Sequence, residues 1–141
     1  MADWTETPQW LAPHPTPEDR EFWEGAHRGE LRIQHCTTCG KYQHFARMLC
    51  SHCGAETLEW ITASGDGTVY SFTVVRQNGA RPFRDELPYA IAMVELEEGP
   101  MMMGAVTDCD VDAVRIGMPV EVHFVKAADD IGIPYWRPAK A

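Results

Sequence analysis

Four of the five cysteines fall between residues 36 and 54, as two pairs with the same spacing. Two residues separate the cysteines of each pair, and a glycine, Gly40 or Gly54, follows the second. This spacing lets both sulfurs of a pair bind one tetrahedral metal ion from a tight turn, in which the glycine lets the backbone curl. Four thiolates fill the shell and leave no position for water or substrate, so the pattern predicts one structural zinc ion. The predicted ligands are Cys36, Cys39, Cys50 and Cys53.

Iron is the alternative metal, because the same four sulfurs bind iron in rubredoxins. A red colour of the pure protein would indicate such a redox protein. Disulfides or free thiols are the other interpretations, and a reducing compartment disfavours the disulfides. The segment around the cysteines has little core of its own, so we expect metal binding to supply much of its folding free energy.

Three histidines, His35, His44 and His52, lie around this motif and are alternative ligands. Because four cysteines already complete a tetrahedral shell, we expect these histidines to be solvated or to support the ligands from outside. The fifth cysteine, Cys109, lies between two aspartates that would raise the pKa of its thiol, so we expect an inert side chain.

Other signatures of catalysis are absent from the sequence, which contains no GxSxG, no phosphate-binding glycine loop and no HExxH. We therefore predict no catalytic residues. The stretch RQNGARPFRDELP, residues 76–88, is a long loop with three arginines, Arg76, Arg81 and Arg84, in an otherwise acidic protein. Long loops are often functional, and these cations could bind phosphates or a carboxylate-rich partner. The alternative is a solvated loop paired with its own carboxylates.

The charge of the chain limits its partners. Its 141 residues include 12 Lys and Arg against 21 Asp and Glu, a formal net charge of -9, which disfavours binding to a phosphate backbone. No stretch of about 20 apolar residues could span a membrane. The first residues, MADWTETPQW, lack the basic start and apolar core of a secretory signal. We therefore expect a cytoplasmic protein with no membrane and no nucleic-acid partner.

Few helical elements are expected to position these residues. Residues 1–15 are rich in proline and contain Trp4 and Trp10, so we expect an extended arm that docks on another chain or is a disordered tail. Thr16 and Pro17 are typical of a helix start and Gly29 of its end, which predicts a helix over 17–28. A further helical turn is expected within 110–117.

Strand patterns dominate the rest of the chain. The alternation of apolar and polar residues, with turn residues between the runs, predicts a mainly β fold with a five-stranded OB-fold barrel. The expected strands are 31–35, 42–45, 68–75, 89–96, 101–107, 120–126 and a short last strand within 133–138. The expected parts are the arm over 1–15, a helix with a rubredoxin-like zinc ribbon over 16–57, and the barrel over 58–141.

The order of these motifs resembles a known family. FWEGAHRGELRIQHC, two CxxCG pairs, SGDGTVYSFTVV, PYAIAMVELEEGP and IGMPVEVHF follow one another as in the domain-of-unknown-function family of rubredoxin-like zinc-ribbon OB-fold proteins, which are associated with acyl-CoA. The resemblance runs from about residue 17 to the C-terminus. Its metal ligands match the four cysteines of the two pairs.

The resemblance implies a non-catalytic accessory subunit of a thiolase-superfamily enzyme, an aldolase or thiolase that acts on CoA esters in steroid side-chain or fatty-acyl breakdown. It implies a hetero-oligomer, with two copies of each chain expected and the acyl-CoA near the interface. A partner of an acyl-CoA hydratase is one alternative. A nucleic-acid-binding protein is another, since Tyr70 and Phe72 alternate on one face as stacking residues would. The net charge argues against the latter.

Overall fold

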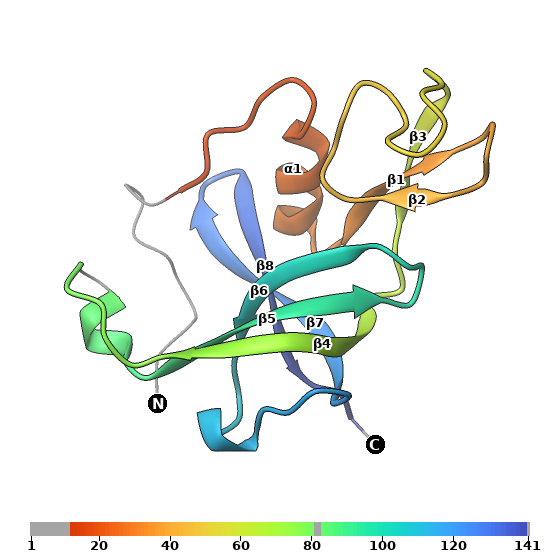
Figure 1. Cartoon of the computed structure of the whole chain (residues 1–141). Coiled ribbons are helices and arrows are strands. Elements are labelled where there is room, and N and C mark those ends of the chain that lie inside the picture. Colours follow the sequence, from red (N-terminus) through yellow and green to blue (C-terminus); the bar gives the residue numbers. More distant parts are fainter. Residues whose placement is uncertain (1–11, 81–82, 141) are drawn as a thin grey trace.

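The computed structural model describes residues 12–80 and 83–140, which form a helix, a small sheet and a barrel (Figure 1). The helix α1 is Arg20–Arg28. A three-stranded sheet has the order β2-β1-β3, and a closed barrel has the order β4-β5-β6-β8-β7. The strands are β1 (Arg32–Cys36), β2 (Tyr42–Gln43), β3 (Leu58–Thr62), β4 (Asp66–Val75), β5 (Tyr89–Leu96), β6 (Met101–Val106), β7 (Pro119–Ala128) and β8 (Ile131–Pro138). Two 3-10 turns, η2 (Phe83–Glu86) and η3 (Val111–Ala113), lie in loops.

The helix begins later than the sequence predicts. The side chain of Asp19 accepts hydrogen bonds from the backbone N–H of Thr16 at 2.6 Å and from its hydroxyl at 3.0 Å. The backbone of Asp19 nevertheless leaves the helical conformation, with φ -108° and ψ 3°, so the start predicted at residue 17 is wrong and the helix begins at Arg20. The end is as predicted, because Gly29 takes a left-handed conformation with φ 84° and donates its N–H to Ala26.

The mainly β prediction is confirmed, with a closed five-stranded barrel. A parallel pair, Val106 of β6 with Trp136 of β8, closes it. The last strand is longer than expected, since β8 begins at Ile131 and pairs along most of its length with β7. The strand β3 pairs with β1 in the ribbon sheet rather than with the barrel.

A β-bulge in β4 changes which side chains face out. The register between β4 and β5 shifts between Val69 and Ser71, so Tyr70 and Ser71 are both exposed. Phe72 then points inward and packs against the core. The predicted alternation of Tyr70 and Phe72 on one face is therefore wrong, because the bulge reverses the side-chain order between them.

The helix α1 packs closely against the barrel at β8. A Cβ on Gly132 would lie only 2.6 Å from the carbonyl carbon of Ala26 and 2.7 Å from the backbone nitrogen of His27. Glycine at this position therefore lets the two backbones approach. Ala26 and Phe22 on the inner face of the helix are buried, as the sequence predicts, and the core continues to the fully buried Trp136 inside the barrel.

Candidate metal centre and neighbouring surfaces

The ribbon brings the four predicted cysteines together. Their sulfur atoms all lie within 4.8 Å of one another. The Sγ atoms of Cys36 and Cys53 are 3.7 Å apart, as are those of Cys39 and Cys50. Zn–S bonds of about 2.3 Å in a tetrahedron place neighbouring sulfurs about 3.8 Å apart. The donor set and its spacing therefore fit one zinc ion, which would hold the two loops of the ribbon together.

Both cysteine pairs use the same backbone turn. The N–H of Gly40 donates to the carbonyl of Cys36 at 2.8 Å, and the N–H of Gly54 donates to that of Cys50 at 2.9 Å. Both glycines have φ 79°, a left-handed conformation that side chains rarely adopt. The glycine that follows each pair in the sequence thus marks the same backbone turn twice, and each turn supplies two sulfurs to the site.

Polar groups beside Cys36 and Cys50 favour the thiolate form that binds metal. The backbone of Cys39 lowers the pKa of Cys36 to about 6, and the Thr57 hydroxyl, 3.7 Å from the Cys36 sulfur, acts in the same direction. The backbone of Cys53 lowers the pKa of Cys50. The backbone of Ala55 lowers the pKa of Cys53, but burial and the neighbouring sulfurs outweigh it and raise this pKa to about 11. Thr57 was not predicted, because it contacts Cys36, which lies 21 residues earlier in the sequence.

The three histidines near the motif contact groups other than the metal site. His35 Nδ1 lies 2.8 Å from a carboxylate oxygen of Glu59, and His52 Nε2 lies 3.3 Å from the carbonyl of Tyr42. His44 is partly buried beside Phe22, and burial lowers its pKa to about 4. The expectation that they leave the metal to the cysteines agrees with this geometry.

Two buried glutamines hold the loop between the cysteine pairs, and the sequence analysis did not predict them. Gln34 Oε1 accepts from the N–H of Arg47 at 2.9 Å, while Gln34 Nε2 donates to the Arg47 carbonyl at 2.9 Å. Gln43 Nε2 donates to Gln34 Oε1 at 2.8 Å, and Gln43 Oε1 accepts from the N–H of Ser51 at 2.8 Å. The signal in the sequence was that each glutamine is a polar residue at an inward-facing position of a short strand.

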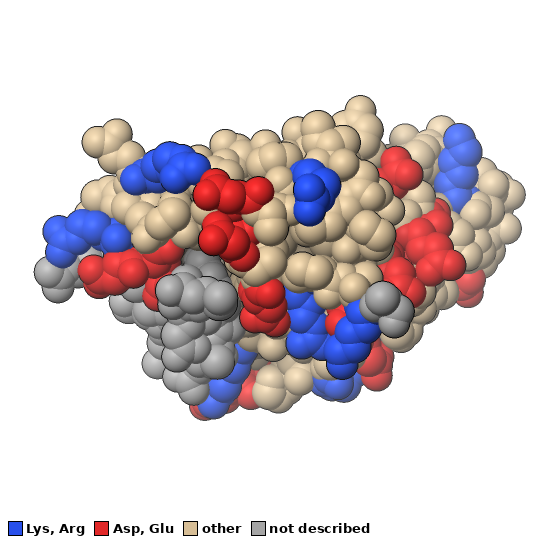
Figure 2. Space-filling model, turned by 90° about the horizontal axis from the view of Figure 1, so that it is seen from below, with Lys and Arg blue, Asp and Glu red and all other residues tan. Residues whose placement is uncertain are grey.

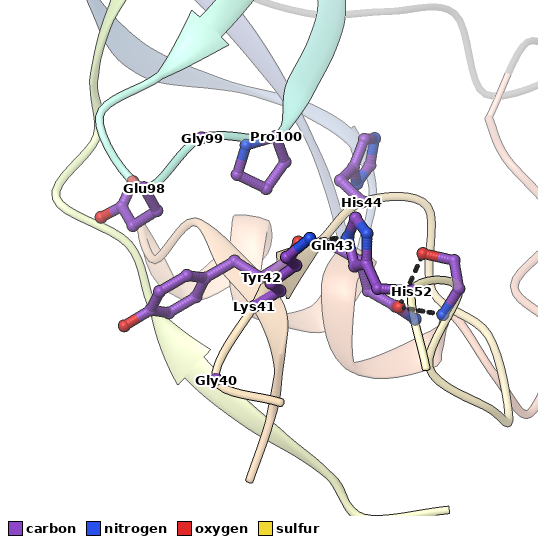
Figure 3. A pocket seen from close by; sticks show the side chains of 10 residues that line it. Gly40, Lys41, Tyr42, Gln43, His44, His52, Glu98, Gly99 and Pro100 are labelled. Atoms are coloured by element: carbon purple, nitrogen blue, oxygen red, sulfur yellow. Dashed lines mark hydrogen bonds between the residues drawn. The ribbon is translucent and has the colours of Figure 1, made fainter. Parts of the chain in front are cut away.

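A cleft of about 520 Å³ lies between the ribbon and the turn joining β5 to β6 (Figure 3). Gly40, Lys41 and Tyr42 line one side, and Glu98, Gly99 and Pro100 lie opposite them. Ser51 and His52 are also in its lining, but the hydroxyl of Ser51 donates to Gln43. His52 contacts the Tyr42 carbonyl instead of that hydroxyl. The cleft thus contains a serine and a histidine without the hydrogen bond that activates a nucleophile.

A hydroxyl–imidazole pair does exist in the barrel. Thr107 Oγ1 lies 2.6 Å from His123 Nε2, and burial lowers the pKa of His123. Thr107 is only 3% exposed and its hydroxyl also bonds to the carbonyl of Trp136, so a substrate cannot reach it. Burial and the flanking aspartates raise the pKa of Cys109, as the sequence predicts. Both features therefore have structural roles.

The arginine loop is only partly described. Arg76 forms a largely exposed ion pair with Asp112 at 3.6 Å, and Arg84 lies on η2. Arg81, Trp4 and Trp10 lie outside the described residues.

The surface charges bear on the nucleic-acid alternative. On the described part of the face in Figure 2, Lys and Arg side chains form separate groups interspersed with Asp and Glu. That face therefore has no continuous basic area of the kind a phosphate backbone requires. None of the described helices is long and apolar enough to cross a membrane.

Comparison with known families covers most of the chain. Residues 23–59 match the family described as "ChsH2, rubredoxin-like zinc ribbon domain". Residues 60–125 match the one described as "ChsH2, C-terminal OB-fold domain". The two matches meet at the middle of β3, where the ribbon sheet leads into the barrel.

This chain aligns with different shares of two curated relatives. It is 35% identical over 134 residues to the "Probable enoyl-CoA hydratase alpha subunit" of Thermomonospora curvata, and this alignment covers 94% of this chain and 41% of that protein. The chain thus spans about two fifths of that relative. It is 38% identical over 96 residues to a "DUF35 domain-containing scaffold protein" of Methanocaldococcus jannaschii, with 67% of each chain covered.

A solved structure described as "Ltp2-ChsH2(DUF35) aldolase" has a chain of the same fold. The TM-score is 0.81 at 32% sequence identity, and the match covers 91% of this chain and 99% of that one. The ribbon, the helix and the barrel thus recur together in a chain of nearly the same extent.

Proposed function

This chain belongs to the DUF35 family of rubredoxin-like zinc-ribbon OB-fold proteins, and from that membership we propose that it is a non-catalytic accessory subunit of an acyl-CoA enzyme. The favoured partner is a thiolase-superfamily aldolase or thiolase that carries the chemistry. The accessory chain would stabilise this partner and help to shape its acyl-CoA site.

The similarity to the Ltp2-ChsH2(DUF35) aldolase is the observation that carries the proposal. A match over 99% of that chain supports the whole unit, rather than the ribbon or the barrel by itself, as the accessory module. The sulfur shell of the ribbon is closed, so its metal would supply folding free energy and rigidity, not a site for substrate.

The chemistry of the described residues supports the same role. Thr107, whose hydroxyl lies beside the imidazole of His123, is buried. Ser51 and His52 contact other groups. An accessory role requires no nucleophile and base in this chain, whereas an independent enzyme would require them within hydrogen-bond reach.

A hydratase is the second candidate partner. The relative from Thermomonospora curvata is named as a hydratase alpha subunit, and this chain aligns with about two fifths of it. In that relative the matched module is part of a longer subunit. The aldolase partner is favoured because the chain in that structure matches the fold of this one with a TM-score of 0.81 at 32% sequence identity.

Three further elements belong to the proposal. Arg76, Arg81 and Arg84 would lie near the CoA phosphates or the partner, since a net-negative chain needs a local cationic group to approach CoA. Trp4 and Trp10 of the arm would contact the partner. The complex would contain two copies of each chain and function in the cytoplasm, where its thiols stay reduced.

Co-purification tests this function. The tagged chain is purified from its source cells in moderate salt, and the retained protein is identified by mass spectrometry. We expect an aldolase, thiolase or hydratase of CoA esters in a fixed ratio to the chain. Retention of nucleic acid that is lost on raising the salt, with no such enzyme present, would contradict the proposal and favour the nucleic-acid alternative.

A further inference from the structure

The described residues expose several large apolar side chains on the ribbon and on three strands of the barrel, and we name this set the apolar band. Soluble chains expose single apolar side chains routinely, but a contiguous group marks an interaction site. Their exposed fractions run from 36% to 74%. The band consists of Phe45, Met48, Leu49, Tyr70, Met93 and Met103.

On the barrel, strand pairing makes the band continuous. Met103 of β6 lies directly opposite Met93 of β5, so their side chains are neighbours on the outer face. Met93 in turn lies opposite Ser71 of β4, and the β-bulge brings Tyr70 to the same outer face. The band therefore crosses three neighbouring strands, which run side by side in Figure 1.

An apolar groove of about 160 Å³ joins the barrel part of the band to the ribbon. Phe45 from the ribbon, Met103 from β6 and Trp23 from the helix all line it. The groove also has Gly104 of β6 and Pro134 of β8 in its lining, so it lies along the seam where these two strands close the barrel. Helix, ribbon and barrel thus contribute to one surface.

Hydrogen bonds from two buried glutamines hold the ribbon part of the band in place. Gln34 binds both the N–H and the carbonyl of Arg47, and Gln43 Nε2 lies 3.4 Å from the carbonyl of Leu49. These bonds fix the backbone that carries Phe45, Met48 and Leu49. A surface that is ordered before binding loses less conformational entropy when a partner covers it.

The charge of the groove indicates a protein rather than CoA as its occupant. Among the described residues of its lining, Asp19 is the one ionic side chain and none is Lys or Arg, so the groove offers no cation to the phosphates of CoA. Arg47 lies at the edge, 5.9 Å from the ring centre of Phe45. Methionine and aromatic residues in the centre with charge at the rim are the composition of protein interfaces.

We propose that the apolar band is the surface on which the catalytic subunit of the acyl-CoA enzyme docks. This proposal rests on the proposed function, because it takes its occupant from there. The chain with a TM-score of 0.81 to this one belongs to a structure described as an aldolase with Ltp2, which favours such a subunit over a second copy of this chain. The band would then bring ribbon and barrel against the same partner, and the groove beside it would add Trp23 of the helix.

The test measures the affinity between this chain and the catalytic subunit that co-purifies with it. The double variant Phe45→Ser/Met103→Ser removes two side chains from the centre of the band. Loss of such interface anchors should weaken binding and raise the dissociation constant about 30-fold or more. Lys140→Ser is the control, since this exposed side chain belongs neither to the band nor to the lining of the groove. Zinc content and circular dichroism must match the wild type in both variants.

The outcomes separate this proposal from the proposed function. If the wild-type chain retains no acyl-CoA enzyme, the proposed function fails and the docking surface fails with it. If the wild type binds the enzyme and the double variant binds it equally well, the docking surface alone is refuted. A chain that dimerises by itself, and becomes monomeric in the double variant while still binding the enzyme, would assign the band to a second copy and also refute the proposal.

Discussion

Gln43 and Gln34 form a buried side-chain hydrogen bond of 2.8 Å between β2 and β1, and together they hold the loop that joins the two cysteine pairs. Gln34 also binds both backbone groups of Arg47 in that loop, and Gln43 accepts from the N–H of Ser51, inside the second cysteine pair. The loop is therefore tied to the sheet by amides as well as by the metal. Sequence patterns report the metal ligands but not this second attachment.

Replacing Gln34 by Ala should loosen the loop without removing the metal ligands. Both backbone groups of Arg47 would lose their partner, at a cost of about 1–3 kcal/mol in the free energy of unfolding. Hydrogen exchange at the Arg47 amide should accelerate, while zinc content stays at one ion per chain. Unchanged exchange at that amide would show that the glutamine does not hold the loop.

Replacing Cys39 by Ser should remove the zinc and lower the melting temperature. The remaining three sulfurs cannot complete the tetrahedral shell, and metal binding contributes to folding. Cys109→Ser is the matched control, because this thiol lies outside the cluster and should leave zinc content unchanged. The measurement is metal analysis with thermal unfolding. A fully folded, metal-free Cys39→Ser protein would contradict a structural metal.

Replacing Gly132 by Ala should destabilise the contact between the helix and the barrel. The added Cβ would meet the backbone of Ala26 at 2.6 Å, so the helix must shift, at a cost of about 1–3 kcal/mol. Gly79→Ala is the control, because a Cβ there meets no atom within 4 Å. Urea unfolding measures both. Equal stabilities of the two variants would refute the close approach of helix and strand.

His44 should make the protein less stable in mild acid. Burial lowers its pKa to about 4 from 6.5, so the folded state binds fewer protons than the unfolded state between these values. Its stabilising contribution is therefore complete above pH 6.5 and is lost as the pH falls toward 4. At pH 5 the loss would be about 2 kcal/mol.

The measurement for His44 is the free energy of unfolding at pH 7.5 and pH 5. In His44→Gln the decrease between the two should be smaller than in the wild type by about 2 kcal/mol. Any effect of pH on zinc binding is common to both proteins and cancels in this comparison. Equal decreases in both would show that His44 does not titrate with a lowered pKa.

Local patterns predicted the metal ligands and most of the strands. Each CxxCG pair is a short turn whose geometry depends on neighbouring residues. The strand Tyr89–Leu96 was predicted with its observed bounds because its alternation begins after Pro88 and ends at the turn over 97–100. The helix end at Gly29 was predicted for the same reason. These features need no knowledge of distant parts of the chain.

Most of the features that the sequence did not predict depend on contacts outside the local pattern. The β-bulge beside Tyr70 arises from pairing with β5, and it reverses the face of Phe72. Gln34 gains its role only because Arg47, 13 residues along the chain, folds over it. The apolar band likewise draws on the ribbon loop and three strands of the barrel. The later helix start has a local cause, since the backbone of Asp19 leaves the helical conformation.

The turnover of a CoA ester tests the central claim most directly. The rate is measured for this chain alone, for the catalytic subunit alone and for the two together, with fatty-acyl and steroid side-chain CoA esters as substrates. We predict no conversion by this chain alone and a higher rate, or a longer lifetime, of the catalytic subunit when the chain is present. Conversion by the purified chain alone, or partner kinetics that are the same with and without it, would contradict an accessory role.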